Sequence, residues 1–222
     1  MTDNVLASSL VLNYEIYPRH EVDETNIRDI VQAMQAGAVL PPIVADRKTR
    51  IVVDGFHRVR AAQRLHGAAQ AMVDAEFAAY PDEAAMFEDA IRRNAGHGRK
   101  LTPYDKARCI VRAEELRLDP ERVYRAMAVT RERYDVLQAR KIAVFDGRRM
   151  AIKHTLASLA GEDLSSEQAE GNRRATGMAP LVYVNQVINV LEHDLWDRDD
   201  ARISERLRYL GGLLSEKLAV PM

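Results

Sequence analysis

The residues best suited to chemistry lie close together in the run Asp54-Gly55-Phe56-His57-Arg58-Val59-Arg60. The β-branched residues before this run predict a strand, its Asp-Gly pair predicts a turn, and the residues that follow predict a helix. Three basic side chains then fall in the first helical turn, where the helix dipole disfavours cations and favours anions. A glycine turn, free backbone N–H groups and basic side chains together indicate a site for an anion, most simply a phosphate. The alternative is that Arg58 pairs with Asp54 and only stabilises the turn.

The overall composition places few limits on function. The chain has 222 residues, of which 47% are hydrophobic and 29% charged, with a formal net charge of −1. One or two ordinary globular domains are expected, and any contact with DNA must depend on a local basic patch. No apolar run is long enough to span a membrane, and the N-terminus shows no basic-then-apolar pattern, so a cytoplasmic location without a membrane partner is expected. The single cysteine, Cys109, excludes an internal disulfide and is expected in a helix core.

The first hundred residues predict a mixed α/β module. Residues 1–10 are expected to be loose, and 12–17 to form a strand. Asp23 is a predicted N-cap for a helix that ends at Gly37. Strands are predicted over 39–45, from Ile51 as a hairpin partner, and over 72–77, with helices after Gly55 and over 81–93.

Nearly everything beyond residue 100 is predicted to be helical. Thr102-Pro103, Asp119-Pro120 and Thr130 have the residue types of helix N-termini. Further helices are predicted over 149–160, from Ser165 or Ser166 to about Gly177, and over 181–195 and 201–218.

The two short helices predicted at 120–127 and 131–142 resemble a helix-turn-helix, with Ala128 at the tight-turn position where many such motifs have glycine. Its interior is expected to contain Val123, Met127, Val129, Tyr134 and Leu137. Side chains that suit phosphates and base edges are expected on the second helix, namely Arg131, Arg133, Gln138, Arg140 and Lys141. Residues 131–153 carry seven basic and three acidic side chains, an excess of +4. The alternative is a solvated face on an ordinary helical domain.

Residues with catalytic potential are few. The histidines show no metal-ligand spacing, and neither a Walker loop nor a Gly-x-Ser-x-Gly elbow is present. Asn94 and His97 lie at a helix exit, where they could reach a phosphate or Mg²⁺, although capping is the commoner role for asparagine. Asp54 is a candidate base or metal ligand, although a turn-forming role is common for aspartate.

The order of these elements resembles the N-terminal region of the ParB family, whose first domain shares its fold with sulfiredoxin. The resemblance covers about residues 10–145 and depends on Pro18-Arg19, the segment 39–44, the segment 54–62, and Arg93-Asn94 followed by 97–102. It implies that the Gly55-x-x-Arg58 turn holds the triphosphate of CTP, or of ATP as in kinase-like relatives, with Mg²⁺. The nucleotide-binding residues it implies are Arg19, Gly55, Phe56, His57, Arg58, Arg60, Asn94 and His97, with Asn94 also a Mg²⁺ ligand. Three residues depart from family patterns. His57 replaces an arginine, Arg93 replaces a glutamate, which leaves CTP hydrolysis open, and Phe56 stands where sulfiredoxin has its cysteine.

The predicted fold is therefore α+β. A ParB/sulfiredoxin-like domain (1–97) contains a small mixed sheet, and an all-helical helix-turn-helix domain (98–162) follows it. A C-terminal helical region (163–222) is expected to pair subunits in a homodimer. The predicted function is ParB-like DNA binding, in partition or transcription regulation, controlled by CTP or ATP with Mg²⁺. The first alternative is a phosphotransferase or NTPase that uses Arg58 with Asp54 or Glu76. The second is a scaffold that binds neither ligand.

Overall fold

The computed structural model describes residues 2–96, 100–175, 187, 191 and 200–218. The chain divides into two compact units, Met1–Met178 and Ala179–Met222. The first unit contains all the elements discussed below except helix α9 (Ala201–Leu218), which belongs to the second. The domain boundaries at 97 and 162 stay predictions.

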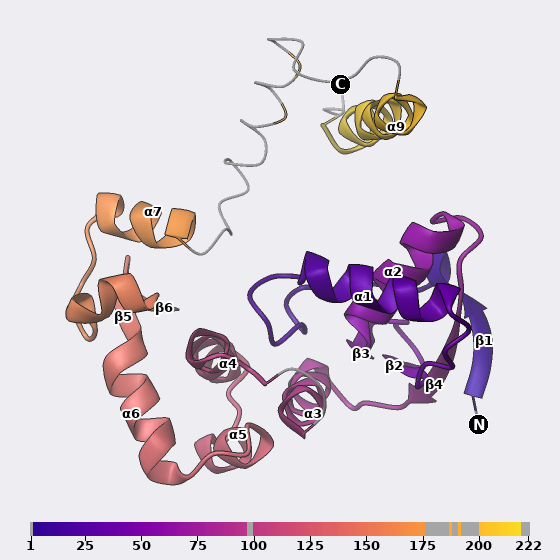
Figure 1. Ribbon diagram of the computed structural model, residues 1–222. Coiled ribbons are helices and arrows are strands. Elements are labelled where there is room, and N and C mark those ends of the chain that lie inside the picture. The colour runs from indigo at the N-terminus through magenta and orange to yellow at the C-terminus, as the bar shows by residue number, and fades with distance from the viewer. Residues whose placement is uncertain (1, 97–99, 176–186, 188–190, 192–199, 219–222) are drawn as a thin grey trace. The chain divides into compact units, whose positions relative to one another are not determined.

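A four-stranded mixed sheet forms the start of the first unit (Figure 1). Its strands are β1 (Thr2–Leu6), β2 (Ile43–Asp46), β3 (Val52–Asp54) and β4 (Met72–Ala78), in the order β1-β4-β2-β3. β4 pairs with β1 antiparallel and with β2 parallel, while β2 and β3 form the expected antiparallel hairpin.

Two helices, α1 (Glu24–Gln35) and α2 (Phe56–His66), pack side by side next to this sheet (Figure 1). The Asp23 side chain caps α1 by accepting from the N–H groups of Thr25 and Asn26, as predicted. α2 begins at Gly55, whose φ of +105° lies in the left-handed region. A Cβ on Gly55 would lie 2.5 Å from Ile43 Cγ2, so both the conformation and the packing require glycine.

Four helices follow, α3 (Glu83–Gly96), α4 (Pro103–Glu115), α5 (Pro120–Ala126) and α6 (Arg131–Lys141). Thr102, Asp119 and Thr130 cap the last three of these through their side chains, as predicted. One hydrophobic cluster runs from Val53 of β3 through Phe87 of α3 into Ile110 and Leu137 of α4 and α6. The sheet and these helices therefore share a core within the first unit.

The helix predicted over 149–160 is wrong. Strands β5 (Ile142–Phe145) and β6 (Arg148–Ala151) form a hairpin there, followed by the 3-10 helix η2 (His154–Leu159) and by α7 (Ser166–Ala175). Asp146 and Gly147 connect the strands with φ of 51° and 70°, which is the conformation that an Asp-Gly hairpin turn requires.

The N-terminal predictions are also corrected. Residues 2–6 are not loose, because backbone pairing with β4 orders them as an edge strand. The strand expected over 12–17 is absent; Val11 forms a single bridge with Ile51, and Ile16 N–H donates to Asn13 in a turn. A short 3-10 helix, η1 (Ala7–Ser9), follows β1.

The helix predicted over 181–195 lies almost entirely outside the described residues, whereas the one predicted over 201–218 is confirmed as α9. Among the helices that the structure describes, none combines the length and the apolar character needed to cross a membrane.

Candidate functional site

A cavity of about 620 Å³ opens in the first unit, between the segment 17–23, the segment 40–42, the start of α2, the end of α3 and the start of α4. Its volume is within the usual range for small-molecule sites. Its charged lining comprises Arg19, Arg58 and Arg93 against Glu21, Asp23, Asp54, Glu76 and Asp105.

The N-terminus of α2 forms one wall of the cavity. Gly55 is the N-cap and makes no side-chain cap, and the first intrahelical bond runs from Val59 N–H to Gly55 O at 3.0 Å. The N–H groups of the first turn are thus left for a ligand, in the arrangement that binds phosphates in many proteins.

Arg58 lies across this helix start and is already engaged. Its guanidinium donates to the carbonyls of Pro41 and Pro42 at 2.6 and 2.9 Å and to Asp54 Oδ2 at 2.8 Å. The turn-stabilising pair with Asp54, one of the two interpretations from the sequence, is therefore present. These contacts use three of the five guanidinium N–H groups and leave two for a ligand.

His57 lies beside Arg58 in an uncharged state. Its Nε2 accepts the N–H of Asp23 at 3.0 Å, which requires that nitrogen to be unprotonated. Burial, reinforced by the charges of Arg19 and Arg58, lowers the pKa of His57 from 6.5 to about 4. His57 therefore joins the start of α2 to the cap of α1 and adds no positive charge to the cavity.

Arg19 and Asn94 meet on another wall. Arg19 Nε donates to Asn94 Oδ1 at 3.3 Å, while the Asn94 amide donates to Ala90 O at 2.9 Å. Arg93 donates to the buried carboxylate of Asp89 at 2.8 Å. The Asn94 oxygen, the predicted Mg²⁺ ligand, is thus engaged by the Arg19 guanidinium.

The residues fit a nucleotide that brings a divalent cation with it. Three arginines against five carboxylates leave the lining with two excess negative charges, so a bare triphosphate would meet net repulsion. Mg²⁺ neutralises phosphates and is usually bound by one or two protein oxygens plus water and phosphate. Among the described residues, no three His, Cys, Asp or Glu side chains gather as a metal site of their own.

Phe56, Arg60 and His97 are the remaining predicted nucleotide-binding residues. Phe56 is among the residues that line the cavity, but its side chain is 2% exposed and stacks on Tyr17 with ring centroids 4.4 Å apart, so it also belongs to the core. Arg60 is exposed, lies outside the cavity lining and donates to the Tyr14 hydroxyl. His97 lies outside the described residues.

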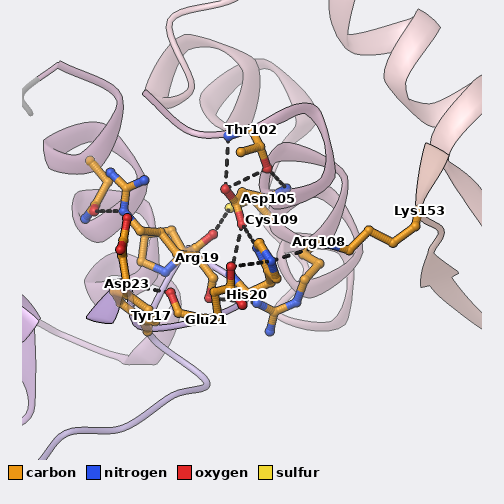
Figure 2. A network of polar contacts seen from close by, with 12 residues as sticks. Tyr17, Arg19, His20, Glu21, Asp23, Thr102, Asp105, Arg108, Cys109 and Lys153 are labelled. Atoms are coloured by element: carbon orange, nitrogen blue, oxygen red, sulfur yellow. Dashed lines mark hydrogen bonds and ion pairs between the residues drawn. The ribbon is translucent and has the colours of Figure 1, made fainter. Parts of the chain in front are cut away.

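The structure also adds cavity residues that sequence reasoning missed, namely Tyr17, His20, Glu21, Thr102 and Asp105. Figure 2 shows how His20 and Asp105 meet, with His20 Nδ1 2.7 Å from Asp105 Oδ1. The spacing Thr102-x-x-Asp105 indicates a capping box and could have been recognised. No local pattern joins His20 to a residue 85 positions later in the chain.

A second region, α5 and α6, contains the predicted DNA-binding residues. Val123, Met127, Tyr134 and Leu137 are buried between the helices and Val129 is half-buried, as predicted; Ala128 in the turn has a φ of 52°. Arg131 pairs with Asp135, and the half-buried Gln138 donates to Glu114 of α4. Arg133 and Arg140 are exposed and Lys141 is half-buried.

Lys106 of α4 lies near Arg133 of α6 and near Lys100, which precedes α4, and we call Lys100, Lys106 and Arg133 the α4–α6 basic group. Burial, with the positive charges of Arg133 and Lys100, lowers the pKa of Lys106. Within the described residues, no salt bridge involves any of the three. Unneutralised like charges on neighbouring helices favour an anion between or above them.

Comparisons with known proteins give low-identity structural similarity. No family model matches the chain, and neither does any curated protein. Among solved structures, C-terminally truncated chromosome-partitioning protein ParB from Caulobacter crescentus, complexed to the centromeric parS site, is 21% identical over 61% of this chain and 69% of that chain, with a TM-score of 0.44. The same protein complexed with CTP-gamma-S gives 22% identity over 62% and 76%, with a TM-score of 0.37.

A pNOB8-like ParB N-domain is 14% identical over 68% of this chain and 53% of that chain, with a TM-score of 0.39. All of these similarities are at low sequence identity and have TM-scores below 0.5.

Proposed function

We propose that this chain is a DNA-binding protein whose first unit binds a nucleoside triphosphate with Mg²⁺, and that the nucleotide controls DNA engagement in partition or transcription regulation. The observation that carries the proposal is the uncapped N-terminus of α2, which opens into a cavity with Arg19 and Arg58 on its walls. CTP is the first nucleotide to test, because the resemblance of the sequence to the ParB family implies it, and ATP is the second.

Thermal unfolding with CTP, ATP and GTP, each with and without Mg²⁺, tests nucleotide binding. A ligand at 100 times its dissociation constant stabilises the folded state by about 2.7 kcal/mol, which for a chain of this size raises the melting temperature by about 5–10 °C. The shift should need Mg²⁺ because of the excess carboxylates in the cavity. Arg58→Ala should reduce it, whereas Arg60→Ala, on the same helix but outside the cavity, should not. Equal melting temperatures with and without every nucleotide would refute the nucleotide part of the proposal.

The DNA part of the proposal is supported by the α4–α6 basic group and by the exposed cations of α6. Side chains that contact backbone phosphates release counterions, so DNA affinity should fall steeply with salt. Filter binding over a salt series gives the slope of log affinity against log salt concentration. This slope should become shallower by about 0.9 when Arg133 or Lys106 is replaced by alanine. Arg64→Ala, which removes an arginine paired with Glu24 on α1, is the matched control. Failure of the unaltered chain to bind DNA at low salt would refute this part.

Two further elements of the proposal concern assembly and turnover. Pairing of subunits through the C-terminal helices is consistent with exposed Leu214 and Leu218 on α9, and light scattering of the purified chain tests it. The exposed Glu76 is a carboxylate in the cavity and keeps a phosphotransferase or NTPase as the second candidate. Nucleotide turnover by the unaltered chain that is lost in the Glu76→Gln variant would favour the phosphotransferase or NTPase.

A further inference from the structure

The segment Pro18–His20, which carries Arg19 into the cavity, is attached to α4 by consecutive backbone contacts (Figure 2). The Cys109 thiol lies 3.4 Å from Pro18 O, Arg108 Nη1 donates to Arg19 O at 2.8 Å, and His20 N–H donates to Asp105 Oδ1 at 2.9 Å. Together the three contacts hold the two peptide groups that flank the Arg19 Cα.

These groups are suited to a permanent attachment. Burial raises the pKa of Cys109 to about 12, so its sulfur keeps the proton that it donates. Burial alone would raise the pKa of Asp105, but hydrogen bonds from His20 and Thr102 outweigh it and hold that pKa well below its usual range. Asp105 is therefore held as a carboxylate at neutral pH.

Asp105 performs two tasks with its two oxygens. Oδ1 accepts from the N–H and the Nδ1 of His20, at 2.9 and 2.7 Å. Oδ2 accepts from the N–H and the hydroxyl of Thr102, at 2.9 and 2.8 Å, and so completes the capping box of α4. One buried side chain thus joins the start of α4 to the segment that bears Arg19.

We propose that Arg108 and Asp105 are positioning residues for the nucleotide: they fix the backbone of Pro18–His20 from α4, so that the Arg19 side chain projects into the cavity beside Asn94. The proposal rests on the proposed nucleotide binding and goes beyond it, because Arg108 is not part of the cavity lining. α4 also carries Lys106 of the α4–α6 basic group, so the backbone that holds Arg19 is attached to a helix of the proposed DNA surface. Any effect of nucleotide binding on DNA affinity that passes through this helix must be matched by an equal effect of DNA on nucleotide affinity.

A double-mutant cycle tests the role of Arg108. The dissociation constant of CTP with Mg²⁺, or of ATP with Mg²⁺ if ATP is the nucleotide that binds, is measured for the full chain, Arg108→Ala, Arg19→Ala and the double variant. If Arg108 acts by positioning Arg19, Arg108→Ala should raise the dissociation constant about five- to tenfold in the native background and less than twofold when Arg19 is already alanine. Arg108→Lys, which keeps a donor for Arg19 O, should recover most of the affinity.

Two controls separate this role from a structural one. Urea unfolding of every variant shows whether the fold persists. Arg122→Ala removes an arginine that pairs with Glu88 between α5 and α3, away from the cavity, and should leave the dissociation constant unchanged. Equal losses in both Arg19 backgrounds would show that Arg108 acts on the fold or through its charge, and would overturn this inference while leaving the proposed function intact. Absence of nucleotide binding by the unaltered chain would overturn both.

Discussion

Gly55→Ala provides the sharpest test of how the cavity wall is built. The new Cβ would lie 2.5 Å from Ile43 Cγ2 and 2.9 Å from Ile43 Cβ, both within a buried β-branched side chain that has little freedom to move. The alanine would also have to adopt a φ of +105°. Backbone strain of this kind costs about 1–3 kcal/mol and overpacking a further 1–3 kcal/mol, so we expect a loss of about 3 kcal/mol in the free energy of unfolding.

Urea unfolding and thermal melting measure this loss. For a chain of this length, 3 kcal/mol lowers the melting temperature by about 10 °C. Gly37→Ala is the matched control, because Gly37 also has a positive φ, +81°, but no atom lies within 4 Å of the position that a Cβ would take there. Gly37→Ala should therefore cost only the backbone strain, about 1 kcal/mol. Equal losses for the two variants would refute the close approach of Ile43 to the helix start.

Three more outcomes follow from particular residues. The pKa of His57 is lowered to about 4 in the folded chain, so the unfolded chain binds the extra proton first as the pH falls below 6.5. The free energy of unfolding should therefore decrease between pH 6.5 and pH 4, by at most about 1.4 kcal/mol per pH unit. Urea titrations should show a shallower decrease for His57→Gln. Asp54→Asn removes one carboxylate from the cavity and weakens the hold on Arg58, so it should raise nucleotide affinity on the order of threefold by calorimetry. Gly147→Val places a β-branched residue at a φ of +70° and should lower the urea-unfolding free energy by about 1–3 kcal/mol.

The parts of the fold that the sequence predicted correctly depend on local chemistry. Asp23, Thr102, Asp119 and Thr130 each cap a helix by bonding a backbone N–H two or three residues ahead, so residue type and spacing are sufficient. The Asp146-Gly147 pair also has the residue types of a hairpin turn, although a helix was predicted over 149–160.

The parts that were missed depend on contacts between distant residues. β1 is ordered only by β4, about 70 residues away, and its polar sequence contains no strand periodicity. Within the site, Gly55 and Arg58 could be found from the residue types of their turn, and Arg19 was implied by the ParB resemblance. The attachment of His20 to Asp105 and of Arg108 to Arg19 O required the tertiary structure, as did the discovery that Arg60 faces away.

The engagement of Arg58 limits how a phosphate can bind here. Its guanidinium holds the carbonyls of Pro41 and Pro42 and the Asp54 carboxylate, so the same side chain supports the wall of the cavity and faces its ligand. A phosphate can use the two remaining N–H groups, or it can displace Asp54, or it can draw the guanidinium away from the segment 41–42. Only the first route leaves the contacts of Arg58 with Pro41, Pro42 and Asp54 unchanged. Since the lining has an excess of carboxylates, a ligand that brings Mg²⁺ also gives Asp54 an alternative cation to face, which lowers the cost of displacing it. A phosphate bound by the third route would therefore change the segment 41–42, whereas a phosphate bound by the first route would not.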